Sequence, residues 1–107
     1  MEKFIGSWEL LRMMANGRIL VDNEDRTSQN VAILYEFKEG GECAMHRMGN
    51  TAHGTWGIGS PNLISMNFLE AGGNFTGEYW FDVNKLIMKG HVGNDEMHFV
   101  LKDKMEL

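Results

Sequence analysis

A chain of 107 residues with 43% hydrophobic residues is long enough for one domain, and it can form a core without metals or disulfides. The formal net charge is -5 and acidic residues are spread along the chain, so the surface repels phosphate backbones and predicts no nucleic-acid partner. The single cysteine, Cys43, excludes an internal disulfide and favours the cytoplasm. The start lacks the apolar run of a signal peptide, and no stretch is long enough to span a bilayer. We therefore expect a single cytoplasmic domain over residues 1–107, with no membrane contact.

Closely spaced turn signals divide the chain into short apolar segments. Met1–Ile5 can form a short helical turn that would plug the fold. Asn16-Gly17 lies between the first two apolar runs and favours a type I′ hairpin turn, because both residues adopt positive φ readily. The polar stretch Asn23–Gln29 is predicted as a loop. The segments between the turn signals are predicted strands: Trp8–Ala15, Arg18–Val21, Val31–Lys38, Cys43–Met48, His53–Ile58, Leu63–Leu69, Phe75–Phe81, Leu86–Lys89 and Met97–Lys102.

Alternation along these strands separates an apolar face from a polar one, because successive side chains of a strand point to opposite sides. The residues expected on the apolar face are Trp8, Leu10, Val31, Ile33, Tyr35, Phe37, Cys43, Met45, Trp56, Ile58, Ile64, Met66, Phe68, Phe75, Gly77, Tyr79, Phe81, Leu86, Met88, Met97, Phe99 and Leu101. An open sheet with so little helix could not cover that face. The predicted fold is therefore all-β, an antiparallel up-and-down meander of about eight or nine short strands that closes into a small barrel.

Seven large apolar residues interrupt the alternation by falling on the polar face. They are Leu11, Met13, Leu34, Leu63, Leu69, Trp80 and Val100. Strand ends or a β-bulge that shifts the register would explain them. An interface between two copies of the chain would explain them equally well. Both explanations remain open at this stage.

Three segments resemble the small bacterial lipocalin-like proteins of the calycin group. Gly6-Ser7-Trp8 looks like the Gly-x-Trp start of their first strand, and Tyr35–Gly41 is similar to their strand followed by a glycine turn. Gly54-Thr55-Trp56, followed by Leu63–Met66, looks like a later strand pair of these domains. The resemblance implies a lipocalin-like barrel that holds a small ligand. This chain looks shorter than a typical lipocalin, and it lacks that family's disulfides and C-terminal helix.

Methionines and aromatic residues on the apolar face suggest a ligand-binding interior. Met side chains are unbranched and polarizable and adapt to varied apolar guests, whereas an inward tyrosine hydroxyl can orient a ligand. The predicted function is non-catalytic binding of a small, largely apolar ligand, and the predicted lining is Tyr35, Met45, Trp56, Met66, Tyr79 and Met88. The same residues could instead fill the core. The alternative function is then a homodimeric interaction module that uses Leu11, Met13, Leu34 and Trp80.

The sequence predicts no catalytic residues, metal ligands or cofactor. Its four histidines match no metal-ligand spacing, and the alternation places Glu36, Glu42 and Glu78 on the outer face. Gly54–Gly59 is similar to the glycine-tryptophan strand of nitrobindin-type haem barrels, which keeps haem as a minor alternative. The alternation nevertheless places His98, the histidine nearest the chain end, outside the barrel.

Overall fold

The computed structural model describes residues 4–23, 33–47, 49–68 and 73–103. Within these ranges it contains nine strands and no helix. The strands are β1 (Gly6–Ala15), β2 (Arg18–Asp22), β3 (Ile33–Phe37), β4 (Glu42–Arg47), β5 (Asn50–Gly59), β6 (Leu63–Phe68), β7 (Gly73–Asp82), β8 (Lys85–Val92) and β9 (Asp95–Asp103). Each predicted strand is present, although several of its ends differ by a few residues. Val31, Met48, Leu69 and most of the predicted loop Asn23–Gln29 lie outside the described residues.

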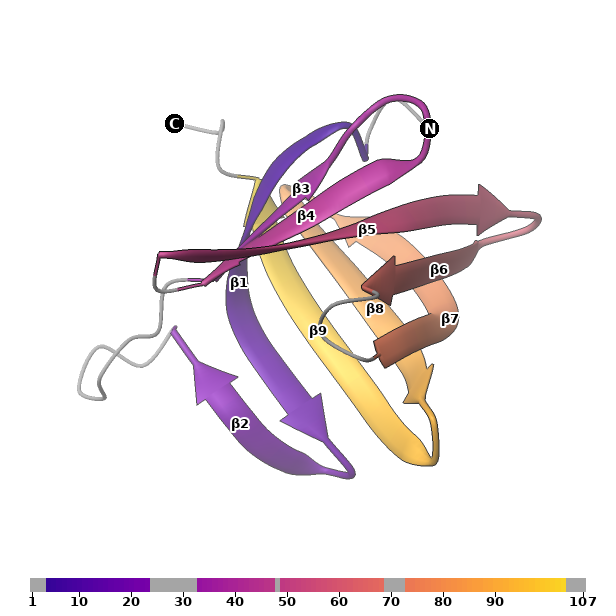
Figure 1. Ribbon diagram of the computed structural model, residues 1–107. Coiled ribbons are helices and arrows are strands. Elements are labelled where there is room, and N and C mark those ends of the chain that lie inside the picture. Colours follow the sequence, from indigo (N-terminus) through magenta and orange to yellow (C-terminus); the bar gives the residue numbers. More distant parts are fainter. Residues whose placement is uncertain (1–3, 24–32, 48, 69–72, 104–107) are drawn as a thin grey trace.

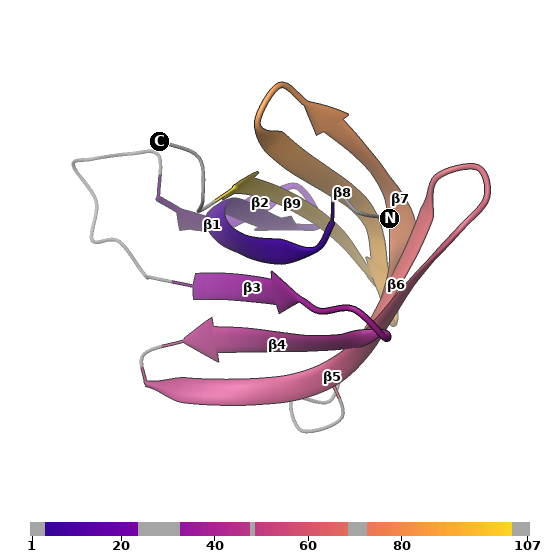
Figure 2. The ribbon, with the colours of Figure 1, turned by 90° about the horizontal axis from the view of Figure 1, so that it is seen from above.

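All pairings between the strands are antiparallel, and they close the sheet into a barrel (Figures 1 and 2). From β3 to β9 each strand pairs with the next, and β9 pairs with β1 along most of their length. The other edge of β1 is shared, because Gly6–Glu9 pairs with β3 whereas Arg12–Ala15 pairs with β2. Strand β2 is therefore an extra strand outside the closed ring. The predicted all-β antiparallel barrel is confirmed.

The predicted apolar face lines the interior of this barrel. The inner-facing residues that are buried are Trp8, Leu10, Ile33, Tyr35, Phe37, Cys43, Trp56, Ile64, Met66, Phe68, Phe75, Leu86, Met88, Phe99 and Leu101. Met45, Ile58, Tyr79, Phe81 and Met97 are partly buried and pack against this core. The alternation therefore identified the side that excludes water.

A β-bulge in β1 corrects the prediction for Met13. The register between β1 and β9 shifts between Leu10 and Arg12, so Leu11 is an extra residue without a partner in the β9 ladder. Beyond the bulge Met13 lies opposite Phe99 and packs against the core. Strict alternation placed Met13 on the polar face, and this placement was wrong because the bulge reverses the alternation after it; of the two explanations left open for Met13, the bulge is confirmed.

Two glycines opposite each other allow the backbones of β7 and β8 to approach closely. Gly77 pairs with Gly90, and a Cβ on either residue would collide with the backbone of the opposite strand. Only glycine permits such a close approach of two backbones. The predicted Asn16-Gly17 turn is also present, since Asn16 has a φ of 53° and Gly17 a φ of 82°.

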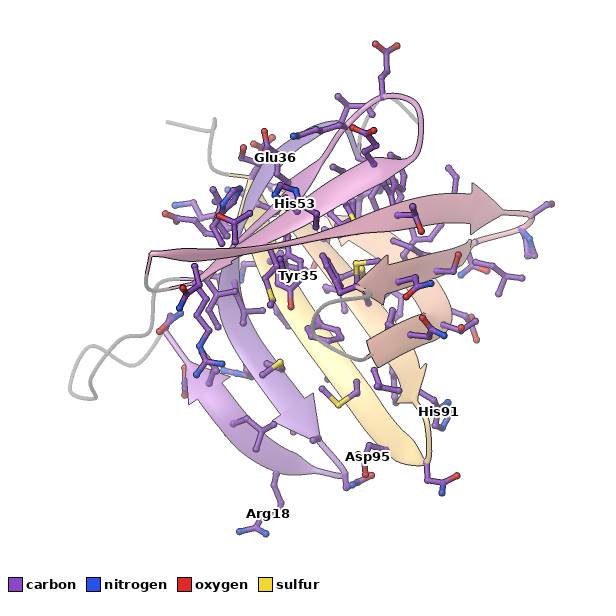
Figure 3. All side chains as sticks on the ribbon, in the orientation of Figure 1. Arg18, Tyr35, Glu36, His53, His91 and Asp95 are labelled. Carbon is purple, nitrogen blue, oxygen red and sulfur yellow. The ribbon has the colours of Figure 1, made fainter. Side chains whose placement is uncertain are left out.

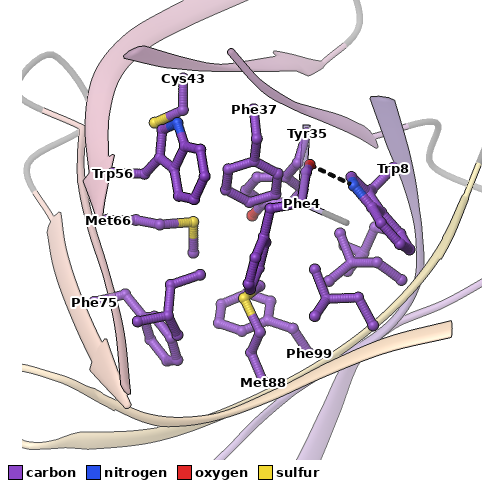
Figure 4. Close-up of a cluster of buried hydrophobic side chains, with 14 of the residues drawn as sticks. Phe4, Trp8, Tyr35, Phe37, Cys43, Trp56, Met66, Phe75, Met88 and Phe99 are labelled. Carbon is purple, nitrogen blue, oxygen red and sulfur yellow. Dashed lines mark hydrogen bonds between the residues drawn. The ribbon is translucent and has the colours of Figure 1, made fainter. Parts of the chain in front are cut away.

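The segment before β1 closes one end of the barrel without forming a described helix. Phe4 and Ile5 form a turn and a bend, while Met1–Lys3 of the predicted helical plug lie outside the described residues. The Phe4 side chain is only 1% exposed. The Trp8 indole Nε1–H donates a 3.0 Å hydrogen bond to the Phe4 carbonyl oxygen, which fixes the turn against β1 (Figure 4).

Candidate functional site

One end of the barrel interior is filled by aromatic rings, and we call it the aromatic end. The Phe4 ring lies at its centre (Figure 4). Its centroid lies 4.7 Å from that of Tyr79, 5.3 Å from Phe81, 5.4 Å from Trp56 and 5.6 Å from Phe37. Ring pairs at these distances attract beyond the area they bury. The side chain of Phe4 thus occupies the place that a guest would take at this end.

The six predicted lining residues form three cross-strand pairs on the inner face. Tyr35 lies opposite Met45, Trp56 opposite Met66, and Tyr79 opposite Met88. Trp56 and Tyr79 contact Phe4, so they belong to the aromatic end. The Trp56 indole Nε1–H also donates a 2.9 Å hydrogen bond to the Lys38 carbonyl oxygen, which holds the ring in place. These two side chains are therefore committed to packing.

The opposite end of the interior is lined by partly exposed apolar side chains, and we call it the methionine end. Its members pack against the core but keep part of their surface in solvent: Met13, Val21, Met45, Ala52, Val92 and Met97. The strand register pairs four of them, because Met13 lies opposite Val21, and Met45 lies opposite Ala52. Phe75 lies opposite Val92 and contacts the Phe99 ring at 5.2 Å. An apolar guest could therefore replace water at this end without displacing a fully buried ring.

Tyr35 supplies a polar atom beside the methionine end. Its ring packs 6.1 Å from Phe68 and 6.2 Å from Phe99, and Figure 3 shows its hydroxyl directed into the barrel. No residue in the described part of the chain forms a hydrogen bond with this hydroxyl. Burial raises the pKa of Tyr35 to about 12, with a further contribution from Cys43 that Arg47 opposes. The hydroxyl therefore stays neutral at physiological pH and can donate to a ligand oxygen or nitrogen.

Sequence reasoning included Met97 on the inner face but not among the lining residues, and it missed four further residues of the methionine end. Met13 was missed because the break in alternation at Leu11 and Met13 fitted an interface as well as the β-bulge that the structure contains. Val21 lies in the strand outside the ring, while Ala52 and Val92 extend β5 and β8 beyond their predicted bounds. An apolar residue beyond the predicted end of each strand is the sequence signal that would have revealed Ala52 and Val92.

Metal ligation, thiol chemistry and haem ligation are the other chemistries that the described residues could offer. No group of three His, Cys, Asp or Glu side chains there could hold a metal ion, and no helix there is long and apolar enough to cross a membrane. Burial raises the pKa of the Cys43 thiol to about 11, so the thiolate nucleophile is scarce at neutral pH. His98 lies opposite Lys89 on the outer face and cannot reach a group inside the barrel.

Comparison of the chain with protein-family models, with curated proteins and with solved structures found no match. The candidate site therefore rests on the geometry of the barrel: a filled aromatic end, and a methionine end with one inward hydroxyl.

Proposed function

We propose that the protein binds a small, largely apolar ligand at the methionine end of the barrel. The observation that carries the proposal is the set of partly exposed inner side chains around the inward Tyr35 hydroxyl. Burial of apolar ligand surface there would supply most of the free energy of binding, at about 25 cal/mol per Å² removed from water. The flexible methionines would adjust to the shape of the guest. Met66 and Met88 lie deeper, at 3% and 0% exposure, and form the floor of this site.

In this proposal Tyr35 orients the ligand. Its hydroxyl would donate a hydrogen bond to an acceptor on an otherwise apolar molecule, and burial of the pair would strengthen the bond. The aromatic end would serve as a fixed wall, since Phe4 fills it. The ligand would therefore enter past Met13, Met45 and Met97 and not past Phe4.

The proposal extends to family and location. The antiparallel barrel, together with the Gly6-x-Trp8 start, supports a lipocalin-like protein of the calycin group. The buried, unpaired thiol of Cys43 supports a reducing compartment, and we propose the cytoplasm.

Binding is tested with the neutral apolar dye N-phenyl-1-naphthylamine, whose fluorescence rises when water is excluded. We expect saturable binding to the wild-type protein. Met97→Arg should weaken it about tenfold or more, because the variant places a charge at the mouth of an apolar site. The matched control is Leu63→Arg, a change to an exposed outer residue. Equal binding by both variants would show that the dye binds elsewhere.

The role of Tyr35 is tested separately with Tyr35→Phe. Native mass spectrometry of wild-type protein purified gently from cells would first identify any co-purified ligand. For a ligand with a hydrogen-bond acceptor, the variant should lose about 0.5–1.5 kcal/mol of binding free energy. Unchanged affinity would remove Tyr35 from the site but would leave the methionine end in place.

A second candidate function is homodimer formation through an apolar row on the outer face. Trp80 lies opposite Ile87, and Ile87 lies opposite Val100, so the row crosses β7, β8 and β9. Trp80 is 44% exposed, and Leu63 near it is 46% exposed. Met13 is not part of this surface, since it faces the interior. Sedimentation of wild-type protein and Trp80→Glu tests the idea. A monomer at all concentrations in the wild type would refute it.

A further inference from the structure

A chain of hydrogen bonds joins three polar side chains on the outside of β3, β4 and β5. The His46 Nδ1 atom lies 2.9 Å from the Thr51 hydroxyl oxygen, and the His46 Nε2 atom lies 3.2 Å from Glu36 Oε1. The register explains the contact, because His46 lies directly opposite Thr51, while Glu36 lies two pairs further along the neighbouring strand and so on the same face. The outer face of three adjacent strands thus aligns a carboxylate, an imidazole and a hydroxyl.

The acceptor chemistry of Glu36 sets the direction of this chain. An ionised carboxylate only accepts hydrogen bonds, so the His46 Nε2 atom must carry the proton that points at Glu36. The neutral imidazole then has a lone pair at Nδ1, and the Thr51 hydroxyl must donate to it. A hydroxyl that donates to a base, itself oriented by a carboxylate, is the arrangement that activates an oxygen nucleophile.

The three hydrogen-bonded side chains are accessible to solvent, and therefore to a substrate. The side chains of His46 and Glu36 are 39% and 35% exposed, and Thr51 is exposed. The Ala44 side chain lies on the outer face of β4, yet it is only 1% exposed, so longer side chains beside it cover it. His53 lies opposite Ala44, two residues from Thr51 on β5, and Figure 3 shows it on the same face as Glu36. His53 can supply a hydrogen-bond donor to an oxygen that gains negative charge near Thr51.

We propose that Thr51, His46 and Glu36 form an acyl-transfer site for small, activated carboxylic esters. The Thr51 oxygen attacks the ester carbonyl carbon while its proton passes to His46 Nδ1. As the bond from that carbon to the leaving oxygen breaks, the leaving oxygen keeps the electron pair and takes the proton from His46, so an alcohol or phenol departs and His46 is neutral again. Water attacks the acyl-threonine, its proton passes to His46, and the Thr51 oxygen recovers a proton from His46. The net reaction is hydrolysis of the ester to an acid and an alcohol.

The roles differ among the residues. Thr51 and His46 are the catalytic residues, because they contact the reacting atoms. Glu36 is a positioning residue, since it acts through His46. The site lies on the outer face, so it is independent of a ligand at the methionine end.

The proposal is tested by hydrolysis of 4-nitrophenyl acetate. We expect Thr51→Ala to lower kcat/KM about 100-fold, whereas Thr51→Ser retains activity because it keeps the hydroxyl. His91→Gln, a change to an exposed histidine on β8, serves as the control for nonspecific attack by surface imidazoles. Peptide mass mapping after a rapid acid quench should find the acetyl group on Thr51. Wild-type activity in Thr51→Ala, or acetylation of histidine or lysine alone, would overturn the proposal.

The positioning role of Glu36 has its own readout. Glu36→Gln should lower kcat more than it raises KM, and it should change the pH profile of kcat, because a neutral amide replaces the carboxylate that His46 contacts. An unchanged profile would show that Glu36 does not act through the imidazole. The substituted side chains lie on the outer face, so far-ultraviolet circular dichroism should show the wild-type fold in each variant.

Discussion

At the scale of single residues, Tyr35 is a phenol in apolar surroundings, and its ionisation reports on them. The Tyr79→Phe variant leaves Tyr35 as the sole tyrosine. We expect the phenolate absorbance of this variant to rise with a midpoint near a pKa of about 12 instead of the ordinary 10.0, because burial disfavours the charged form. An ultraviolet titration of the folded variant measures the midpoint. Titration at the ordinary value would mean that water reaches the hydroxyl freely.

Phe4 contributes to stability although it belongs to no strand. Its ring contacts four other rings and is 1% exposed, so Phe4→Ala would leave a cavity at the aromatic end. We expect the free energy of unfolding to fall by about 3–5 kcal/mol. Ile5→Ala is the control, because Ile5 is 38% exposed, and it should change the stability by well under about 1 kcal/mol. Denaturant unfolding measures both variants. Similar losses would mean that Phe4 is not a packed part of the core.

At the scale of elements, the hairpin between β7 and β8 contains a backbone conformation that its residue disfavours. Val83 has a φ of 58° and a side chain that is 97% exposed. A β-branched residue at positive φ crowds its own carbonyl, and nothing packs on Val83 in return. Val83→Gly should therefore raise the free energy of unfolding by about 1 kcal/mol. Val83→Ala should gain less, because alanine keeps the Cβ. A loss of stability in Val83→Gly would contradict this account.

The elements were predictable because their turns carry residues with strong local preferences. Asn16-Gly17 adopts positive φ at both positions, as type I′ turns require, so the first hairpin follows from two residues. The β-bulge at Leu11 was one of two explanations for the break in alternation, and the sequence could not favour it over an interface, since no local preference distinguishes an extra apolar residue from a regular one. That single shift moved Met13 from the expected outer face to the methionine end. Phe4 was not assigned to the core, because a segment outside the strands has no alternation to read.

The hydrogen bonds that join Glu36, His46 and Thr51 on the outer face show a different limit of sequence reasoning. Alternation correctly placed Glu36 outside, which led to the expectation that it had no chemical role. The contact with His46 depends on the register between β3 and β4, and the contact with Thr51 on the register between β4 and β5. The register of these hairpins is set by the type and length of their turns, so the alternation within each strand does not reveal it.

At the scale of the whole molecule, burial shifts the pKa values of His98, Cys43 and Tyr35, and each shift makes the free energy of unfolding depend on pH. Burial lowers the pKa of His98 below its ordinary 6.5, helped by Lys89 and Arg12 and opposed by Glu96. The folded state favours the neutral form of His98. Its contribution to the free energy of unfolding is therefore present above pH 6.5 and is lost as the pH falls through the folded pKa. Cys43 and Tyr35 act in the opposite sense, because burial raises their pKa values to about 11 and about 12.

Cys43 therefore contributes to the free energy of unfolding below its ordinary pKa of 9.0, and this contribution is lost as the pH rises toward about 11. The contribution of Tyr35 is lost in the same way as the pH rises from 10.0 toward about 12. We expect the free energy of unfolding to be nearly flat between pH 6.5 and 9.0 with respect to these groups, and to fall on either side. Urea unfolding followed by tryptophan fluorescence at a series of pH values measures the curve. His98→Gln should flatten its acid side, whereas Cys43→Ala should flatten the first part of its alkaline side. Linkage requires the slope of the free energy of unfolding against pH to change when the titrating residue is removed. If both variants kept the wild-type slopes, other groups would cause the loss of stability at acid and alkaline pH.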